Sequence, residues 1–171
     1  MKKLTIVFVL CVAAVSAAAA QESSNQSLLQ LFARSAQTEG ITWTFVLLND
    51  RTVDALFQAP GKYAMRARAH QATTFYVQAT PEKDVQIDTV FQVEQDGQTL
   101  TSQSLNIKGF EKGFATKGKR IDGILQLDKK LDLTHPFKIK CTNNSAAEFK
   151  LTDEAVKLSE NVPPPAATPA P

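Results

Sequence analysis

The sequence contains few residues of the kinds that build catalytic and metal-binding sites. Among its 171 residues are two histidines and two cysteines. His70 and His135 stand in no metal-ligand spacing with each other or with Cys141. Neither the Gly-x-Ser-x-Gly pattern of a nucleophile elbow nor a phosphate-binding P-loop occurs. We therefore predict a protein that is not an enzyme and needs no cofactor. An enzyme of unrecognised type is the least favoured alternative.

The acidic residues also lack the pattern of a metal site. Asp122, Asp128 and Asp132 are spaced too irregularly for an EF-hand loop, which places oxygen ligands at alternate positions around a central glycine. Solvated surface positions explain these three residues, and we expect no metal.

An excess of charge of one sign is missing as well. The chain has 19 basic and 17 acidic side chains, and two of the basic ones, Lys2 and Lys3, lie within the first 20 residues. The remainder therefore carries 17 of each sign and is formally neutral. Domains that bind nucleic acid are usually strongly basic, so we expect no nucleic acid as a partner.

The first 20 residues have the pattern of a secretory signal peptide. A positive start at Lys2 and Lys3 precedes an apolar run over residues 4–15, and small residues follow at Ala18 and Ala20. The run is shorter than the ~20 residues that span a bilayer, so a transmembrane anchor is the weaker alternative. No second run of that length follows. We expect an exported protein, periplasmic or extracellular, with no transmembrane segment after cleavage near Ala20.

The two cysteines have different expected fates. Cys11 lies inside the signal and follows Leu10, where a lipoprotein signal has a small residue, so we expect no lipid there. Cys141 is then the only cysteine of the mature chain and has no intramolecular partner. Because it shares strand parity with Phe137 and Ile139, we expect it to be a buried free thiol.

The chain divides into four expected segments. Residues 1–20 are the signal peptide, residues 21–40 a helical segment, residues 41–160 a β-domain and residues 161–171 a Pro/Ala-rich tail that acts as a spacer or docking segment. Apolar residues at three- and four-residue spacing predict the helix over residues 27–37. About 150 residues remain after cleavage, which suits one domain with its own core.

Alternating apolar and polar residues dominate the expected domain. Such alternation indicates half-buried strands, and turn signals every eight to twelve residues favour an all-β fold. We predict an immunoglobulin-like β-sandwich of about eight strands preceded by the short N-terminal helix. The strands are expected near residues 43–48, 53–58, 63–70, 74–79, 87–94, 98–105, 121–127, 137–141 and 149–151.

Two turn and core signals are specific. Asp96-Gly97 predicts a two-residue hairpin that pairs Gln95 with Gln98 and Val93 with Leu100. The strand around Trp43 is apolar on both of its faces, so we expect it to be central and covered on both sides.

One predicted ligand-binding surface lies on two expected strands. The outward positions of residues 63–70 and 74–79 combine an aromatic ring with hydrogen-bond donors, which suits a sugar or a protein partner. A solvated face with Arg-to-acid pairs is the alternative. The residues are Arg66, Arg68, Tyr76 and Gln78.

A second surface is a basic loop punctuated by glycine. Its positive side chains suit an acidic polymer, and a solvated hairpin loop is the alternative. Its residues are Lys108, Lys112, Lys117, Lys119 and Arg120.

The function expected from these features is that of a non-enzymatic β-sandwich module in the bacterial envelope or outside the cell. It would bind another envelope or extracellular protein or assemble into a larger structure. A module that binds a glycan or another envelope polymer is the alternative. Fold alone does not choose between them.

We predict that the mature protein begins at Gln21, because Ala18 and Ala20 supply the small side chains that cleavage requires. Intact-mass spectrometry of the exported protein measures this. A mature form that retains Met1, or one with a lipid on Cys11, would contradict it.

Overall fold

The computed structural model describes residues 25–86, 91–108, 110–111, 113–142 and 145–160. Within them, strands in antiparallel sheets make up most of the regular structure and helices are few. This is the all-β character predicted from the alternation. The expected signal cleavage site, Lys112 and the Pro/Ala-rich tail lie outside the described residues. No helix in the described part of the chain is long and apolar enough to cross a membrane.

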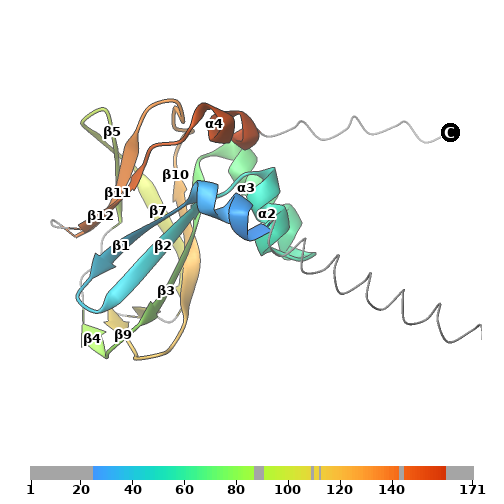
Figure 1. The fold of residues 1–171 in the computed structure, drawn as a ribbon. Coiled ribbons are helices and arrows are strands. Elements are labelled where there is room, and N and C mark those ends of the chain that lie inside the picture. Colours follow the sequence, from blue (N-terminus) through green and yellow to red (C-terminus); the bar gives the residue numbers. More distant parts are fainter. Residues whose placement is uncertain (1–24, 87–90, 109, 112, 143–144, 161–171) are drawn as a thin grey trace, which may run out of the picture.

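The strands form three sheets (Figure 1). The five-stranded sheet has the order β1-β2-β3-β10-β7, and the strands are Ala33–Thr38, Ile41–Leu47, Thr74–Pro81, Ile121–Leu127 and Ser102–Lys108. The four-stranded sheet has the order β12-β11-β5-β6, with Ser145–Phe149, Phe137–Thr142, Gln92–Gln95 and Gln98–Leu100. The small sheet joins β4 (Val85–Gln86), β9 (Phe114–Ala115) and β8 (Phe110–Glu111).

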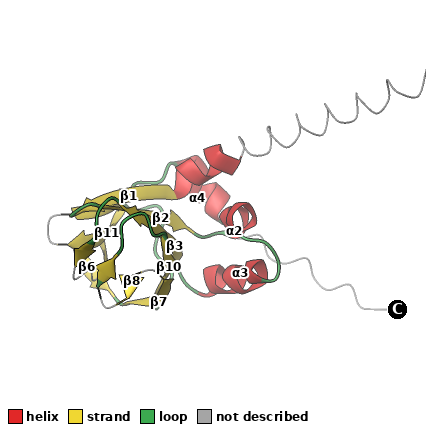
Figure 2. Ribbon diagram, turned by 90° about the horizontal axis from the view of Figure 1, so that it is seen from below, coloured by secondary structure: helices red, strands yellow, loops and turns green. Residues whose placement is uncertain are grey.

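Helices lie on one side of the sheets. They are α2 (Asp50–Leu56), α3 (Gly61–Gln71) and α4 (Asp153–Ser159), and residues 25–32 form a further helical segment. Figure 2 shows α2 and α3 on one side of the five-stranded sheet and the four-stranded sheet on the other. The five-stranded sheet is thus the middle layer. Its two covers come from different parts of the chain.

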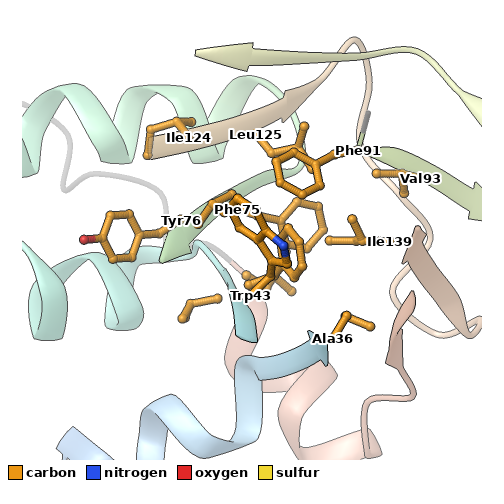
Figure 3. Packing of buried hydrophobic residues seen from close by; sticks show 14 of the residues in the cluster. Ala36, Trp43, Phe75, Tyr76, Phe91, Val93, Ile124, Leu125 and Ile139 are labelled. Carbon is orange, nitrogen blue, oxygen red and sulfur yellow. The ribbon is translucent and has the colours of Figure 1, made fainter. Parts of the chain in front are cut away.

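The core fills the space between the two larger sheets (Figure 3). Trp43 is fully buried and meets the edge of Phe91 with ring centroids 5.1 Å apart. Phe75 lies 5.5 Å from Phe149, which stacks on Phe137 at 4.7 Å. Burial of these rings is the main stabilising contribution, because each removes a large apolar area from water.

Several predicted strands are confirmed. β10 covers residues 121–127, as predicted, and β11 covers residues 137–142. The β5–β6 hairpin pairs Gln95 with Gln98 and Val93 with Leu100, as expected. Asp96 and Gly97 at its tip have φ angles of 52° and 76°, the left-handed values that a type I′ turn requires.

Residues 63–70 were predicted as a strand, and that prediction is wrong because they form most of α3. The segment contains three Ala and two Arg, residues of high helix propensity. Its period-two alternation is fortuitous. Arg66 and Arg68 therefore lie on a helix and not on a strand beside Tyr76.

The weak strand predicted at residues 53–58 is also wrong, because α2 occupies most of that range. Asn49, which precedes it, is an N-cap: its Oδ1 accepts the Thr52 N–H at 3.0 Å, and Thr52 Oγ1 accepts the Asn49 N–H at 2.9 Å. This reciprocal capping box satisfies two donors at the helix start. The capping signal outweighs the β-propensity of the few residues that follow.

The helix predicted at residues 27–37 ends at residue 32, and Ala33–Thr38 is strand β1. Ala36 pairs with Trp43 across the β1–β2 ladder, so the backbone of this segment is hydrogen-bonded to β2 instead of to water. Arg34 Nη1 donates to the carbonyls of Gln30 and Ala33 and so caps the end of the helical segment. With helices in place of two strands, an immunoglobulin-like sandwich of about eight strands is not confirmed.

We expect Trp43→Ala to lower the free energy of unfolding by about 3–5 kcal/mol, since it empties a large volume in the core. It also removes the hydrogen bond from Trp43 Nε1 to Thr38 Oγ1, which is 2.9 Å long and buried. Urea unfolding measures the loss. Thr42→Ala, at an exposed position of the same strand, should change stability by no more than about 0.5 kcal/mol. A loss below about 1 kcal/mol for Trp43→Ala contradicts its central place.

Candidate functional site

Helices α2 and α3 and the sheet face beneath them contain four of the predicted ligand-binding residues. Arg66 and Arg68 lie on α3, while Tyr76 and Gln78 lie on β3. Figure 3 shows Tyr76 pointing away from the Trp43 and Phe75 side of the sheet. The structure therefore places these residues on the same side of the five-stranded sheet, but each of them has different neighbours.

Tyr76 is covered on this face. Its side chain is 8% exposed, and its ring meets the edge of Phe57 at 5.4 Å. Arg120 Nη2 donates to the Tyr76 hydroxyl at 2.6 Å, and this bond raises the pKa of the guanidinium above its ordinary value. An open ring for sugar stacking is therefore absent at Tyr76. Its role in binding stays a prediction that requires Phe57 or Arg120 to move.

The basic loop and the strand face, predicted as separate surfaces, meet at this contact. Lys117 and Lys119 are exposed, and Lys108 ends β7 opposite Asp122. The loop is tethered, because the Lys117 N–H donates to Asp84 Oδ1 at 2.7 Å. Gln78, half-buried on β3, pairs with Asp122 across the β3–β10 ladder. Among the described residues, no single side chain forms an ion pair with both of these exposed lysines.

Arg66 has a structural role between α2 and α3. Its guanidinium forms an ion pair with Asp54 and lies 3.8 Å from Asp50. Lys62 Nζ is 2.8 Å from Asp54 Oδ1, and His70 Nε2 is 2.8 Å from Asp50 Oδ1. These contacts match three basic side chains of α3 with two acidic side chains of α2. They fix the two helices side by side.

Arg68, two residues further along, has a different environment. It is half-buried, and its Nη1 donates to the neutral Gln126 Oε1 at 2.9 Å. No carboxylate of a described residue lies within ion-pair distance of its guanidinium. A half-buried cation without a negative partner carries a desolvation cost that an anionic ligand would offset.

A cavity of about 370 Å³ opens beside Arg68, between the end of α3, the end of β10 and the link from β6 to β7. This volume lies at the lower end of the range for small-ligand sites, ~300–1,000 Å³. The walls are mostly polar, and their guanidinium, amide, hydroxyl and carboxylate groups can all form hydrogen bonds with a ligand. They comprise Arg68, Gln71, Ala72, Thr101, Gln126, Leu127 and Asp128.

Backbone hydrogen bonds hold these walls in place. The Leu127 N–H donates to Thr73 O at 2.9 Å, and the Asp128 N–H donates to Thr101 O at 3.3 Å. Thr73 also donates its N–H to Lys129 O at 3.2 Å and accepts the Leu131 N–H on Oγ1 at 2.8 Å. Thr73 is buried and uses its N–H, its carbonyl and its hydroxyl in these bonds. We call this set of bonds the Thr73 joint.

Four polar residues of the cavity were not predicted as binding residues from the sequence. Gln71, Thr101, Gln126 and Asp128 come from three separate parts of the chain. Only Asp128 drew attention in the sequence, as a poor match to a calcium loop. Single Gln and Thr residues at strand and helix ends form no sequence motif that predicts a binding site. Only the tertiary structure brings them close together.

A second hollow of about 340 Å³ lies on the outer side of the four-stranded sheet and includes Glu94, Lys138 and Glu148 in its lining. Its central carboxylate is already matched, since Glu94 pairs with Lys138 at 3.2 Å and also with Lys140. The hydrogen bond from Lys140 lowers the pKa of Glu94, with Lys138 acting in the same direction. This hollow is therefore a weaker candidate than the one beside Arg68.

The described residues include no group of three or more His, Cys, Asp or Glu side chains that could hold a metal ion. Cys141 is buried and free, as predicted, and burial raises the pKa of its thiol to about 12. A thiol with that pKa stays protonated at neutral pH and is a poor nucleophile.

Comparison of the chain with family models, with curated proteins and with solved structures finds no match.

We expect Cys141 in the native protein to resist alkylation by iodoacetamide and to react only after denaturation, because the thiolate is the reactive form and its formation is suppressed here. Mass spectrometry with and without urea measures the modification. Rapid labelling of the native chain, or a covalent dimer without reductant, contradicts this expectation.

Proposed function

We propose that the protein is an exported, non-enzymatic module that binds another protein of the bacterial envelope or the extracellular space. The observation that carries the proposal is a solvent-facing stripe on α3 that has no charged residue. Its residues, Tyr63, Ala64, Ala67 and Gln71, are all exposed. We call it the α3 stripe.

Tyr63 is the central residue of this proposal. Its side chain is 67% exposed although it is large and aromatic. Tyrosine buries a large area at low entropic cost and is enriched where protein interfaces are strongest. The small side chains of Ala64 and Ala67 leave the ring accessible along the helix. A partner surface with a shallow apolar recess would complete this arrangement.

The charges around the stripe support a fixed binding surface. On one flank, Lys62 and Arg66 are held by Asp54. The helix that bears Tyr63 is therefore linked to α2 before any partner arrives. Pre-organised surfaces lose less conformational entropy on association.

Binding of a glycan or another envelope polymer is the second candidate. The observation that favours it is the polar cavity beside Arg68 on the opposite flank of the same helix. Its guanidinium, amide, hydroxyl and carboxylate groups can donate and accept hydrogen bonds with sugar hydroxyls. The two candidates differ in ligand class and in their central residues, Tyr63 and Arg68, while Gln71 borders both surfaces.

Photo-cross-linking tests the first candidate. A benzoylphenylalanine placed at Tyr63 should give a defined adduct with one protein in an envelope extract. An excess of unlabelled wild-type protein should compete for the adduct, and Tyr63→Ala should compete at least about tenfold less well, because loss of a central interface aromatic typically costs 2 kcal/mol or more.

A cross-linker at Gln98, an exposed residue of β6, is the matched control and should give no competed adduct. Protease treatment of the extract should abolish the Tyr63 adduct. Equal competition by wild type and Tyr63→Ala contradicts the α3 stripe as the interface. Retention on extract that survives the protease favours the second candidate instead.

A further inference from the structure

We propose that the cavity beside Arg68 binds the carboxylate of an acidic sugar, such as a uronic acid unit of an envelope or extracellular polysaccharide. This inference rests on the second candidate function and names its ligand class. It assigns the carboxylate to Arg68 and the sugar hydroxyls to the surrounding polar groups.

The first observation behind the proposal is the charge of Arg68. Arg66 and Arg68 are two residues apart on α3, but only Arg66 has carboxylate partners. Arg68 donates one hydrogen bond to the neutral Gln126 and lines the cavity. A guanidinium presents five N–H donors in a planar fork that matches a carboxylate in two-point contact. The donors not used by Gln126 are therefore suited to an incoming carboxylate.

The second observation is the hydrogen-bonding chemistry of the remaining lining residues. Asp128 accepts hydrogen bonds only, so a bare anion would meet repulsion there, whereas a hydroxyl would donate to it. Gln71 and Gln126 add amide groups that both donate and accept. A ligand with one carboxylate and several hydroxyls satisfies both Arg68 and Asp128. A uronic acid has this combination on a single ring.

The third observation is that hydrogen bonds hold the cavity walls in fixed positions. The Thr73 joint fixes the end of β10 against the link from α3 to β3. Gln126 holds Arg68 in place at 2.9 Å, although the two residues are 58 positions apart in the sequence. The binding groups are therefore arranged before the ligand enters, which lowers the entropic cost of binding.

Isothermal titration calorimetry at low ionic strength tests the proposal with two probes. One is a galacturonic acid trisaccharide, and the other is its methyl ester, which keeps the hydroxyls and lacks the charge. We expect the acid to bind and the ester to bind about 10- to 100-fold more weakly, the range for one hydrogen-bonded charge. Added salt should weaken binding of the acid more than that of the ester.

Three variants locate the binding. Arg68→Gln should weaken binding of the acid about 10- to 100-fold. Gln126→Glu should do the same, because it places a carboxylate where Arg68 already has its partner and so supplies the missing negative charge internally. Arg66→Gln makes the same chemical change as the first variant outside the cavity and should leave binding about unchanged. Circular dichroism shows whether each variant is folded.

Nuclear magnetic resonance of the wild type keeps the proposal testable if a variant does not fold. The Arg68 Nε–H and Gln126 side-chain amide signals should shift on titration with the acid, and the Arg66 Nε–H signal should not. Equal binding of acid and ester, or equal losses in Arg66→Gln and Arg68→Gln, overturns the carboxylate site while polymer binding survives. If neither trisaccharide binds and protease-treated extract retains no protein, the second candidate fails as well.

Discussion

The five-stranded sheet has one face that is apolar along its length and a second that is apolar only around Val46, Tyr76 and Ile124, and the fold covers both apolar areas. On β3 the side chain of Phe75 enters the core and lies 5.5 Å from Phe149 of the four-stranded sheet, whereas Tyr76 points the other way and meets Phe57. Water on either face would leave large apolar areas exposed, at a cost of roughly 25 cal/mol per Å². The helices between β2 and β3 supply the second cover. They also carry the stripe and the cavity on which both proposed functions depend.

Elements with a local signal could be predicted from the sequence. The β5–β6 hairpin follows from Asp96-Gly97 and the alternation beside it, β11 follows from alternation, and β10 follows from its short apolar run. The two missed helices are short and weakly patterned. Helix α2 begins at a capping box that reads equally well as a turn, and α3 alternates by chance. In α3, helix propensity and contacts with α2 decided the structure, and periodicity did not.

The candidate site was predictable only in part, for the same reason. The sequence singled out Arg66, Arg68, Tyr76, Gln78 and the basic loop because their residue types suit binding. It could not show that Arg120 closes over Tyr76, that α2 neutralises Arg66, or that Gln126 meets Arg68. The contacts of Arg120 and Gln126 join residues 44 and 58 positions apart, and that of Arg66 joins two helices that the sequence did not predict. Two arginines with the same local sequence character therefore have opposite electrostatic environments.

The Thr73 joint has a consequence for the speed of exchange at the cavity. One buried threonine binds three backbone groups that belong to the end of β10 and the segment after it. Widening the cavity at this end would break these bonds together, which favours walls that keep their positions when the proposed ligand binds. Association with a rigid, open recess is limited by collision and orientation and not by a conformational step. Differences in affinity among related ligands then reside in how fast each one leaves, and weak ligands would be in rapid exchange.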